Sequence, residues 1–163
     1  MHPGPDQETK ASEQFGLDDR SLEQLKEKAV AAKGRAYCPY SHFRVGAALL
    51  SADGSIIVGA NVENASYPVG TCAERCALAT AVTGGHTSFK ALAVATDITP
   101  SASPCGMCRQ FIREFCSLEM PVFMYDRDGR VVVRTLEKLL PMSFGPEDLK
   151  GAALESGTES GTG

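Results

Sequence analysis

TCAER at 71–75 is one of two short segments that decide how this chain folds, and the other is SPCGMCRQ at 103–110. Each segment follows a predicted strand or loop and lies at the start of a predicted helix. A helix start has unpaired N–H groups and the positive end of the helix dipole, and both stabilise a thiolate relative to a thiol. We therefore expect the cysteines of the two segments to lie at neighbouring helix starts.

Around these segments, helices and strands alternate. Apolar residues at helical spacing, with Gly or Pro near the ends, predict helices over 18–36, 71–83, 106–116 and 136–140. Short apolar or alternating runs predict strands over 43–50, 55–62, 91–96, 121–125 and 131–133. The run ALAVAT at 91–96 is almost entirely apolar, which indicates a strand buried on both faces.

This order of elements favours an α/β fold. An initial hairpin, followed by helices that alternate with strands, predicts a mixed sheet with helices on both faces. A sheet of about five strands is of ordinary size.

Length and composition indicate one folded domain with a tail at each end. The chain has 163 residues, of which 43% are hydrophobic, and this length leaves little room for a second domain. We expect the domain to span 17–150. The polar arm 1–16 is expected to be disordered, and the Gly-, Ser- and Thr-rich tail 151–163 is expected to be flexible.

Charge and hydropathy argue against nucleic acid and membrane partners. The formal net charge is −4, whereas a protein that binds a phosphate backbone is usually basic. The chain has no run of about 18 apolar residues, so no membrane span is expected. A polar N-terminus without an apolar signal core favours a cytoplasmic location.

The six cysteines are then expected to stay reduced. We interpret them as metal ligands, buried small side chains or catalytic groups. An extracellular chain with three disulfides is the alternative that their number permits.

Three cysteines of the two segments are candidate ligands for one metal ion. Cys105 and Cys108 can both reach one ion from a first helical turn, and Cys72 supplies a third ligand. Zinc prefers four ligands, and a catalytic zinc keeps one position for water. Cys76 lies about one turn beyond Cys72 and is expected in the core, and no histidine is near either segment. The ligand set therefore favours an open catalytic zinc site over a closed structural one.

Glu74 makes catalysis the better interpretation of this site. It stands two residues from Cys72, where its carboxylate could take a proton from zinc-bound water and deliver protons to a ring nitrogen and a leaving amine. Arg75 is placed to hydrogen-bond the thiolates and offset their charge, and a solvated surface arginine is the alternative. Cys-x-Glu followed by Pro-Cys-x-x-Cys is similar to the zinc motif of the nucleobase deaminases.

Four further segments extend this resemblance: YCPYSHF at 37–43, VGAAL at 45–49, NVENA at 61–65 and SFGPEDL at 143–149. With them the chain resembles the small homotetrameric cytidine deaminases. The resemblance implies a three-layer α/β/α cytidine deaminase-like fold and one Zn²⁺ per subunit. It also implies hydrolytic deamination of cytidine and deoxycytidine to uridine and deoxyuridine in pyrimidine salvage, with zinc-bound hydroxide attacking C4 of the base and release of ammonia.

The resemblance also implies roles for residues that bind the nucleoside. Asn61 and Glu63 are expected to hold the ribose, because an amide donates and accepts hydrogen bonds and a carboxylate accepts them from hydroxyl groups. The carboxylate of Glu63 would also repel a phosphate and so favour a nucleoside over a nucleotide. Phe43 is expected to stack on the base, and a core strand residue is the alternative.

Two aromatic residues are implied to cross a subunit interface of the homotetramer and make the active sites composite. Phe144 corresponds to an aromatic that reaches the pocket of a neighbouring subunit, and Tyr67 falls in the substrate segment. The backbone of Ala73 and the carboxylate of Glu74 would contact the edge of the base.

Two positions depart from the family pattern. Arg44 stands where proline is frequent, next to the base-stacking position, and is expected to point out of the sheet. Cys76 stands where a small polar residue is common.

Three alternative functions share parts of the pattern. Deaminases of aminopyrimidine antibiotics, of the blasticidin type, have the zinc motif and the tetramer but lack the Asn-x-Glu-Asn segment, which is intact here. Deaminases of nucleotides or polynucleotides usually have His as the first ligand, and a nucleic-acid editor needs a basic channel. A zinc module that only binds partners would not need Glu74.

Overall fold

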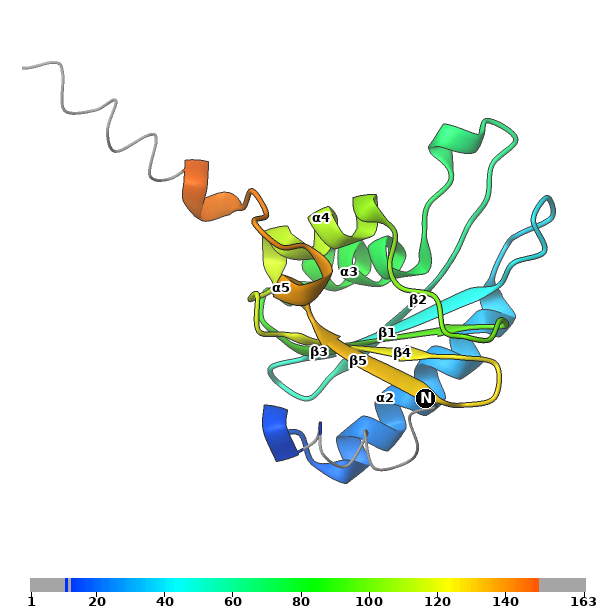
Figure 1. Ribbon diagram of the computed structural model, residues 1–163. Coiled ribbons are helices and arrows are strands. Elements are labelled where there is room, and N and C mark those ends of the chain that lie inside the picture. Colours follow the sequence, from blue (N-terminus) through cyan, green and yellow to red (C-terminus); the bar gives the residue numbers. More distant parts are fainter. Residues whose placement is uncertain (1–10, 12, 150–163) are drawn as a thin grey trace, which may run out of the picture.

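A sheet of five strands forms the middle layer of the fold in the computed structural model, which describes residues 11 and 13–149 (Figure 1). The strands are β1 (Val45–Ser51), β2 (Ile56–Ala60), β3 (Phe89–Thr96), β4 (Pro121–Tyr125) and β5 (Val131–Thr135). The helices are α2 (Asp19–Ala32), α3 (Ala73–Thr83), α4 (Gly106–Phe115) and α5 (Leu136–Leu139). Two 3-10 helices, Lys33–Arg35 and Tyr67–Val69, lie in the connections.

The sheet is mixed, as the sequence predicts. Its strand order is β2-β1-β3-β4-β5, with β3 and β4 parallel and the other neighbours antiparallel. β3 lies at the centre, and residues 91–96 are all buried, which confirms a strand covered on both faces. Parallel pairing of β3 with β4 requires a crossover, and α4 supplies it.

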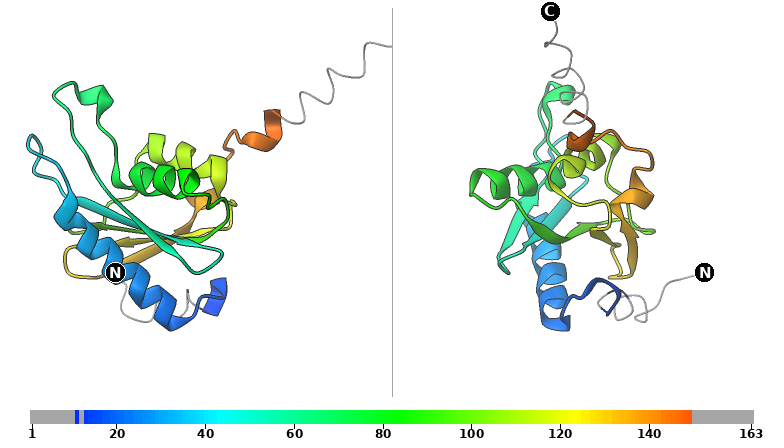
Figure 2. Two further views of the ribbon diagram at one scale, coloured as in Figure 1. Left: turned by 180° about the vertical axis from the view of Figure 1, so that it is seen from behind. Right: turned by 90° about the vertical axis from the view of Figure 1, so that its left-hand side faces the viewer.

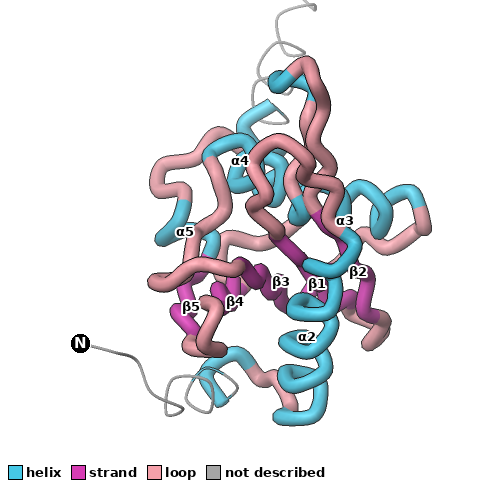
Figure 3. Tube along the Cα trace, turned by 90° about the vertical axis from the view of Figure 1, so that its right-hand side faces the viewer, coloured by secondary structure: helices cyan, strands magenta, loops and turns pink. Residues whose placement is uncertain are grey.

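Helices cover both faces of the sheet, which confirms the three-layer expectation (Figures 2 and 3). α2 lies on one face, and α3 and α4 lie together on the other. α2 is capped at its N-terminus by Asp18, whose side chain accepts a hydrogen bond from the Ser21 N–H at 2.8 Å. Two glycines allow helix and strand to approach closely, because a Cβ at Gly46 would overlap the backbone of α2 and one at Gly59 would overlap that of α3.

Each face of the sheet has its own apolar core. Burying one of its large aliphatic side chains contributes about 1.5–3 kcal/mol. The core beneath α3 and α4 includes Leu49, Leu78, Leu92, Val94, Ile112, Val122 and Leu136. The core beneath α2 includes Leu22, Leu25, Leu50, Phe123, Tyr125 and Val131. Alternate strand residues therefore serve opposite cores, as the two-residue period of a strand requires.

Several element ends differ from the predictions for local reasons. The helix predicted over 18–36 ends as an α-helix at Ala32 and continues as a 3-10 turn through Gly34. The strands predicted over 43–50 and 55–62 lie at 45–51 and 56–60. The side chain of Asn61, not a strand backbone, satisfies the Val45 N–H and the Phe43 carbonyl, so regular pairing stops there.

The end of the N-terminal arm is more ordered than expected. Residues 11 and 13–15 are helical, and Ala11 and Phe15 pack against the core beneath α2 because apolar side chains four residues apart share one helix face. The rest of the arm and the tail 151–163 lie outside the described residues. Across residues 11 and 13–149, no helix combines the length and apolar character needed to span a membrane.

Two loops, 36–44 and 61–72, project from the same end of the sheet (Figures 1 and 2). They are tied together by the Tyr37 N–H, which donates to the Asn61 carbonyl at 2.9 Å, and by the Glu63 N–H, which donates to the Tyr37 carbonyl at 2.7 Å. The second loop leads directly into α3. The fold thus brings the YCPYSHF and NVENA segments next to the TCAER segment.

Candidate active site

Cys72 and Cys105 occupy the N-cap positions of α3 and α4, and neither side chain caps its own helix. Cys108, in the first turn of α4, is fully buried. The three Sγ atoms lie within 4.8 Å of one another, and those of Cys72 and Cys105 are 3.9 Å apart. The structure therefore brings together the three predicted ligands at the starts of two adjacent helices.

The sulfur spacing fits a zinc ion. At a Zn–S distance of about 2.3 Å, two sulfurs of a tetrahedral site lie about 3.8 Å apart. Among the described residues the cluster includes no fourth Cys, His, Asp or Glu, and Cys76 stays outside it. Three thiolates thus form a donor set that zinc accepts, with one position left for water.

Glu74 lies in the first turn of α3 and is only 4% exposed. Burial raises the pKa of its carboxyl above the usual value, and the charge of Cys72 acts in the same direction. An acidic side chain is rarely buried without a partner or a function. Its place beside the cysteines makes it a candidate proton carrier.

The sulfur of Cys72 lies in an environment that favours a thiolate, whereas the hydrogen bond with Cys72 and burial raise the pKa of the Cys108 thiol above its usual value. A hydrogen bond from Cys108 lowers the pKa of Cys72 to about 5, and a contact with Arg75 adds to this effect. Nη2 of Arg75 lies 3.9 Å from Cys72 Sγ and donates to the Gly70 carbonyl at 3.3 Å. Nε of Arg75 is buried without a hydrogen-bond partner in the described structure. These contacts favour a hydrogen bond to the ligands over the surface alternative.

A cavity of about 420 Å³ opens beside the cysteines. This volume lies in the range that is typical of small-molecule sites. Five of the residues singled out in the sequence line it, and they come from three separate segments of the chain: Phe43, Asn61, Glu63, Cys72 and Glu74. Cys105 lines it as well, so the candidate metal site opens directly into this cavity.

Asn61 fixes the position of Phe43 at the cavity wall. Its Nδ2 donates to the Phe43 carbonyl at 2.8 Å, and its Oδ1 accepts from the Val45 N–H at 2.8 Å. Phe43 is half-buried and lines the cavity instead of belonging to either core. An amide has further hydrogen-bonding capacity beyond these two bonds, so Asn61 can also contact a ligand.

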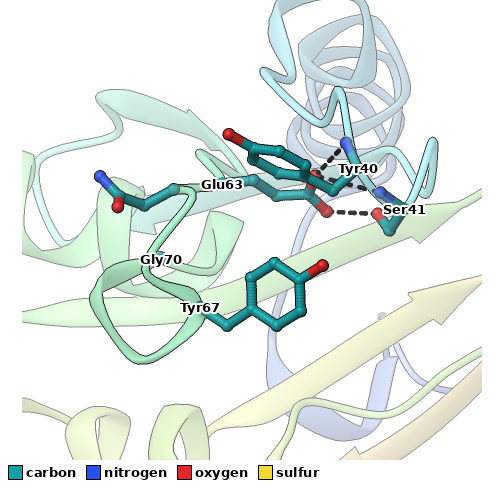
Figure 4. Close-up of a pocket in the computed structure, with 6 residues that line it drawn as sticks. Tyr40, Ser41, Glu63, Tyr67 and Gly70 are labelled. Atoms are coloured by element: carbon teal, nitrogen blue, oxygen red, sulfur yellow. Dashed lines mark hydrogen bonds between the residues drawn. The ribbon is translucent and has the colours of Figure 1, made fainter.

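The carboxylate of Glu63 is held by the loop 36–44 (Figure 4). Oε2 accepts from the N–H groups of Tyr40 and Ser41 at 3.0 and 3.2 Å, and Oε1 accepts from the Ser41 hydroxyl. The Ser41 hydroxyl bond, with these N–H bonds, lowers the pKa of Glu63 against the opposing effect of burial. The resulting anion lies in the wall between the main cavity and a second one of about 300 Å³.

Tyr67 and Phe144 do not reach the main cavity of their own chain. Tyr67 is 76% exposed and lines the second cavity, where its ring centroid lies 5.9 Å from that of Tyr40 (Figure 4). Phe144 is 59% exposed and lines neither cavity. Within one chain, the structure therefore separates these two aromatic residues from Glu74.

The remaining residues singled out in the sequence lie at the edge of the site. Ala73 is fully buried as the first residue of α3. Arg44 is exposed, lines neither cavity and pairs with Asp97 at 2.7 Å, as expected for a side chain that points out of the sheet. Cys76 is half-buried one turn beyond Cys72 and belongs to neither apolar core, so the expectation of a core position is wrong.

The sequence interpretation missed two serines of the main cavity. Ser103 is held by Arg109, whose Nη2 donates to the Ser103 hydroxyl at 2.7 Å and whose Nε donates to the Pro104 carbonyl at 2.7 Å. Ser103 and Arg109 lie within the SPCGMCRQ segment, so their proximity to the candidate ligands Cys105 and Cys108 could have indicated them. Ser41 reaches the cavity through its bonds to Glu63, and no local pattern indicates that long-range contact.

Comparison with known proteins finds cytidine deaminases among the relatives. Residues 19–124 match the family model described as "Cytidine and deoxycytidylate deaminase zinc-binding region". The cytidine deaminase of Sporosarcina psychrophila is 49% identical over 132 residues, which covers 81% of this chain and 97% of that protein. That of Halalkalibacterium halodurans is 44% identical and covers 80% and 98%. A crystal structure of cytidine deaminase from Burkholderia pseudomallei is similar with a TM-score of 0.73 and 43% identity, covering 75% of this chain and 98% of that one.

Proposed function

The chain belongs to the cytidine and deoxycytidylate deaminase family, and from this premise we propose that it is a zinc-dependent cytidine deaminase. It hydrolyses cytidine and deoxycytidine to uridine and deoxyuridine and releases ammonia, a reaction of pyrimidine salvage. One observation carries the assignment: the buried carboxylate of Glu74 lies beside three converging cysteine sulfurs, at the wall of a cavity of suitable size for a nucleoside.

The chemistry divides between the metal and the chain. Zinc held by Cys72, Cys105 and Cys108 supplies Lewis-acid activation of water. Glu74 accepts the two protons of the attacking water in turn and delivers one to N3 of the base and the other to the exocyclic amine, which leaves as ammonia. The oxygen that replaces the amine on C4 comes from water, so cytidine and water give uridine and ammonia. Arg75 hydrogen-bonds the thiolates and offsets part of their negative charge.

The other walls of the cavity recognise the nucleoside. Phe43 stacks on the base, and the backbone of Ala73 contacts the base edge next to Glu74. Asn61 and Glu63 hold the ribose, because the charged Glu63 accepts hydrogen bonds from sugar hydroxyl groups. The same charge repels a phosphate, which favours a nucleoside over its monophosphate.

The active enzyme is proposed to be a homotetramer in which Phe144 and Tyr67 contribute to the sites of neighbouring subunits. The support is a group of exposed apolar side chains on the two projecting loops, between 47% and 76% exposed: Tyr40, Val62, Tyr67 and Val69. Apolar residues gathered in this way are typical of an interaction surface, and Tyr is enriched in interfaces.

Domain limits and location are part of the same proposal. Residues 17–150 form the catalytic domain, with the short helix at 13–15 packed against it. The cytoplasm suits an enzyme whose six cysteines form no disulfide, because thiols stay reduced there.

A substrate panel tests the assignment. Loss of ultraviolet absorbance is followed with cytidine, deoxycytidine, cytosine, cytidine monophosphate and an aminopyrimidine antibiotic, and zinc is counted by elemental analysis of the same preparation. We expect rapid turnover of the two nucleosides, slow turnover of the other compounds and one zinc per chain. Preference for the antibiotic or the monophosphate would contradict the proposal.

A further inference from the structure

The segment 140–149 that carries Phe144 is anchored to α4 by a buried arginine. Arg113, in the last turn of α4, is 6% exposed. Its Nε donates to the Ser143 hydroxyl at 3.0 Å, and its Nη2 pairs with the carboxylate of Glu147. A guanidinium withdrawn from water needs such acceptors, because burying an unpaired charge is costly.

Backbone contacts complete this anchor. Nε2 of Gln110 donates to the Phe144 carbonyl at 3.0 Å, and the Gly145 N–H donates to the Asp148 carboxylate at 2.7 Å. Gly145 is buried, and a Cβ there would overlap the guanidinium of Arg113. We call Gln110, Arg113, Ser143, Gly145 and Glu147 the C-terminal clamp.

The clamp holds the backbone and leaves an apolar face in solvent. Met142, in the left-handed region with φ 53°, is fully exposed, and Phe144 and Leu149 are 59% and 64% exposed. An apolar group of this kind that residues 11 and 13–149 leave uncovered is a candidate contact for another molecule.

The clamp lies far from the cavity of its own subunit. Cys105 caps the start of α4, whereas Arg113 lies in its last turn. The loops 36–44 and 61–72 and the segment 143–149 lie at opposite ends of the molecule in two views (Figures 1 and 2). Phe144 is therefore placed to act on a second copy of the chain and not on its own active site.

We propose that Arg113 is a positioning residue that fixes the segment 143–148 so that Phe144 is presented, already ordered, to the active site of a neighbouring subunit. The inference rests on the composite site of the proposed function and adds the residue that holds Phe144 in position for that site. An ordered segment loses less conformational freedom on contact than a loose one, so the clamp strengthens the contribution of Phe144 to the neighbouring active site.

Kinetics of clamp variants give the first test. Arg113→Met removes the hydrogen bond to Ser143 and the ion pair with Glu147, and Arg113→Lys keeps a charge without the forked geometry of a guanidinium. For Arg113→Met we expect full zinc content and a loss in kcat/KM on the order of ten- to a hundredfold, mainly in KM, as for other misplaced contacts. Arg113→Lys should recover part of the loss. Arg20→Met, an exposed change in α2 on the opposite face of the sheet, is the matched control and should retain parental activity.

Mixed tetramers separate positioning from simple loss of stability. Arg113→Met subunits are coexpressed with Glu74→Gln subunits under different tags, and assemblies that carry both tags are purified. The Glu74→Gln subunit supplies an ordered Phe144, so activity per Arg113→Met subunit should rise toward that of the parent. A Glu74→Gln partner that also carries Phe144→Ala should give no recovery. Equal activity with both partners would overturn the inference.

The result remains decisive if Arg113→Met does not fold. Ser143→Ala and Glu147→Gln then replace it in the same mixtures, because the first removes an acceptor, the second removes the charge of the other, and both leave the arginine in place. A parent protein inactive on cytidine would refute the proposed function itself. An active parent with fully active clamp variants, or an active monomer, would refute the role of Arg113 alone.

Discussion

The side chain of Asn61 bridges the Phe43 carbonyl and the Val45 N–H, with 2.8 Å for each hydrogen bond. One amide at the end of β2 thus sets the position of the residue proposed to stack on the base. The residue proposed to hold the sugar therefore also builds the wall that holds the base. A substitution at Asn61 should therefore affect the binding of both the base and the sugar.

Asn61→Ala should weaken both folding and catalysis. It leaves a backbone N–H and a carbonyl without partners, which costs about 1–3 kcal/mol for buried groups. We expect a lower melting temperature and a higher KM for cytidine, measured by calorimetry and steady-state kinetics. Asn64→Ala, an exposed change in the same loop, is the control. Equal effects of the two substitutions would contradict this role of Asn61.

Glu63→Gln should discriminate between substrates with and without a sugar. The amide keeps the size of the side chain but loses the charge that Ser41 and Tyr40 stabilise. A hydrogen bond to a charged group is worth about 1.5–3 kcal/mol, so kcat/KM for cytidine should fall roughly tenfold to a hundredfold. Turnover of free cytosine should stay near the parental rate. A parallel loss for both substrates would exclude the ribose role.

Cys105→Ala should abolish zinc binding, because two thiolates cannot replace three. Cys116→Ala is the matched control: Cys116 is buried at the end of α4, away from the cluster, and burial raises its pKa to about 12. Elemental analysis should find zinc in the second variant and not in the first. Metal binding is coupled to folding, so Cys105→Ala should also melt at a lower temperature. Retention of zinc by Cys105→Ala would refute the ligand assignment.

Asp97→Asn tests an ion-pair group that anchors the loop before β1. Burial raises the pKa of Asp97, but hydrogen bonds from Arg44 and Lys33 outweigh it and leave the pKa below its ordinary value. A lowered carboxyl pKa contributes stability above the unfolded-state pKa of about 3.9, and that stability is lost as pH falls through the folded-state pKa. We expect Asp97→Asn to be less stable than the parent by up to about 1 kcal/mol at pH 7. The free energies of unfolding of the parent and of Asp97→Asn, measured by urea titration, should converge at low pH. A difference between them that stays constant with pH would contradict the assignment.

Much of the fold follows from local patterns in the sequence. The apolar run at 91–96 predicts the central buried strand, and the strand at 121–125 has the predicted limits. The predicted limits are wrong where contacts of single side chains outweigh the local sequence pattern. The side chain of Asn61 bonds the Phe43 carbonyl and the Val45 N–H at the start of β1, and Phe15 packs the end of a polar arm against the core.

The candidate site likewise combines residues that a local motif predicts with contacts that no motif predicts. Cys72, Cys105, Cys108 and Glu74 belong to two short segments at helix starts, so spacing and chemistry are enough to predict them. The bond between Ser41 and Glu63, and the clamp between Arg113 and Glu147, join positions far apart in the chain. Such contacts depend on how loops pack in three dimensions, and no local period or motif indicates them.

The central claim is that Glu74 carries protons at a zinc site. Glu74→Gln keeps the shape of the side chain and all three cysteine ligands but removes the basic group. Zinc content and turnover of cytidine, measured on the same sample of this variant and of the parent, test the claim most directly. We predict one zinc per chain in both proteins and a loss of nearly all turnover in the variant. Near-parental activity in Glu74→Gln, with zinc retained, would contradict the claim.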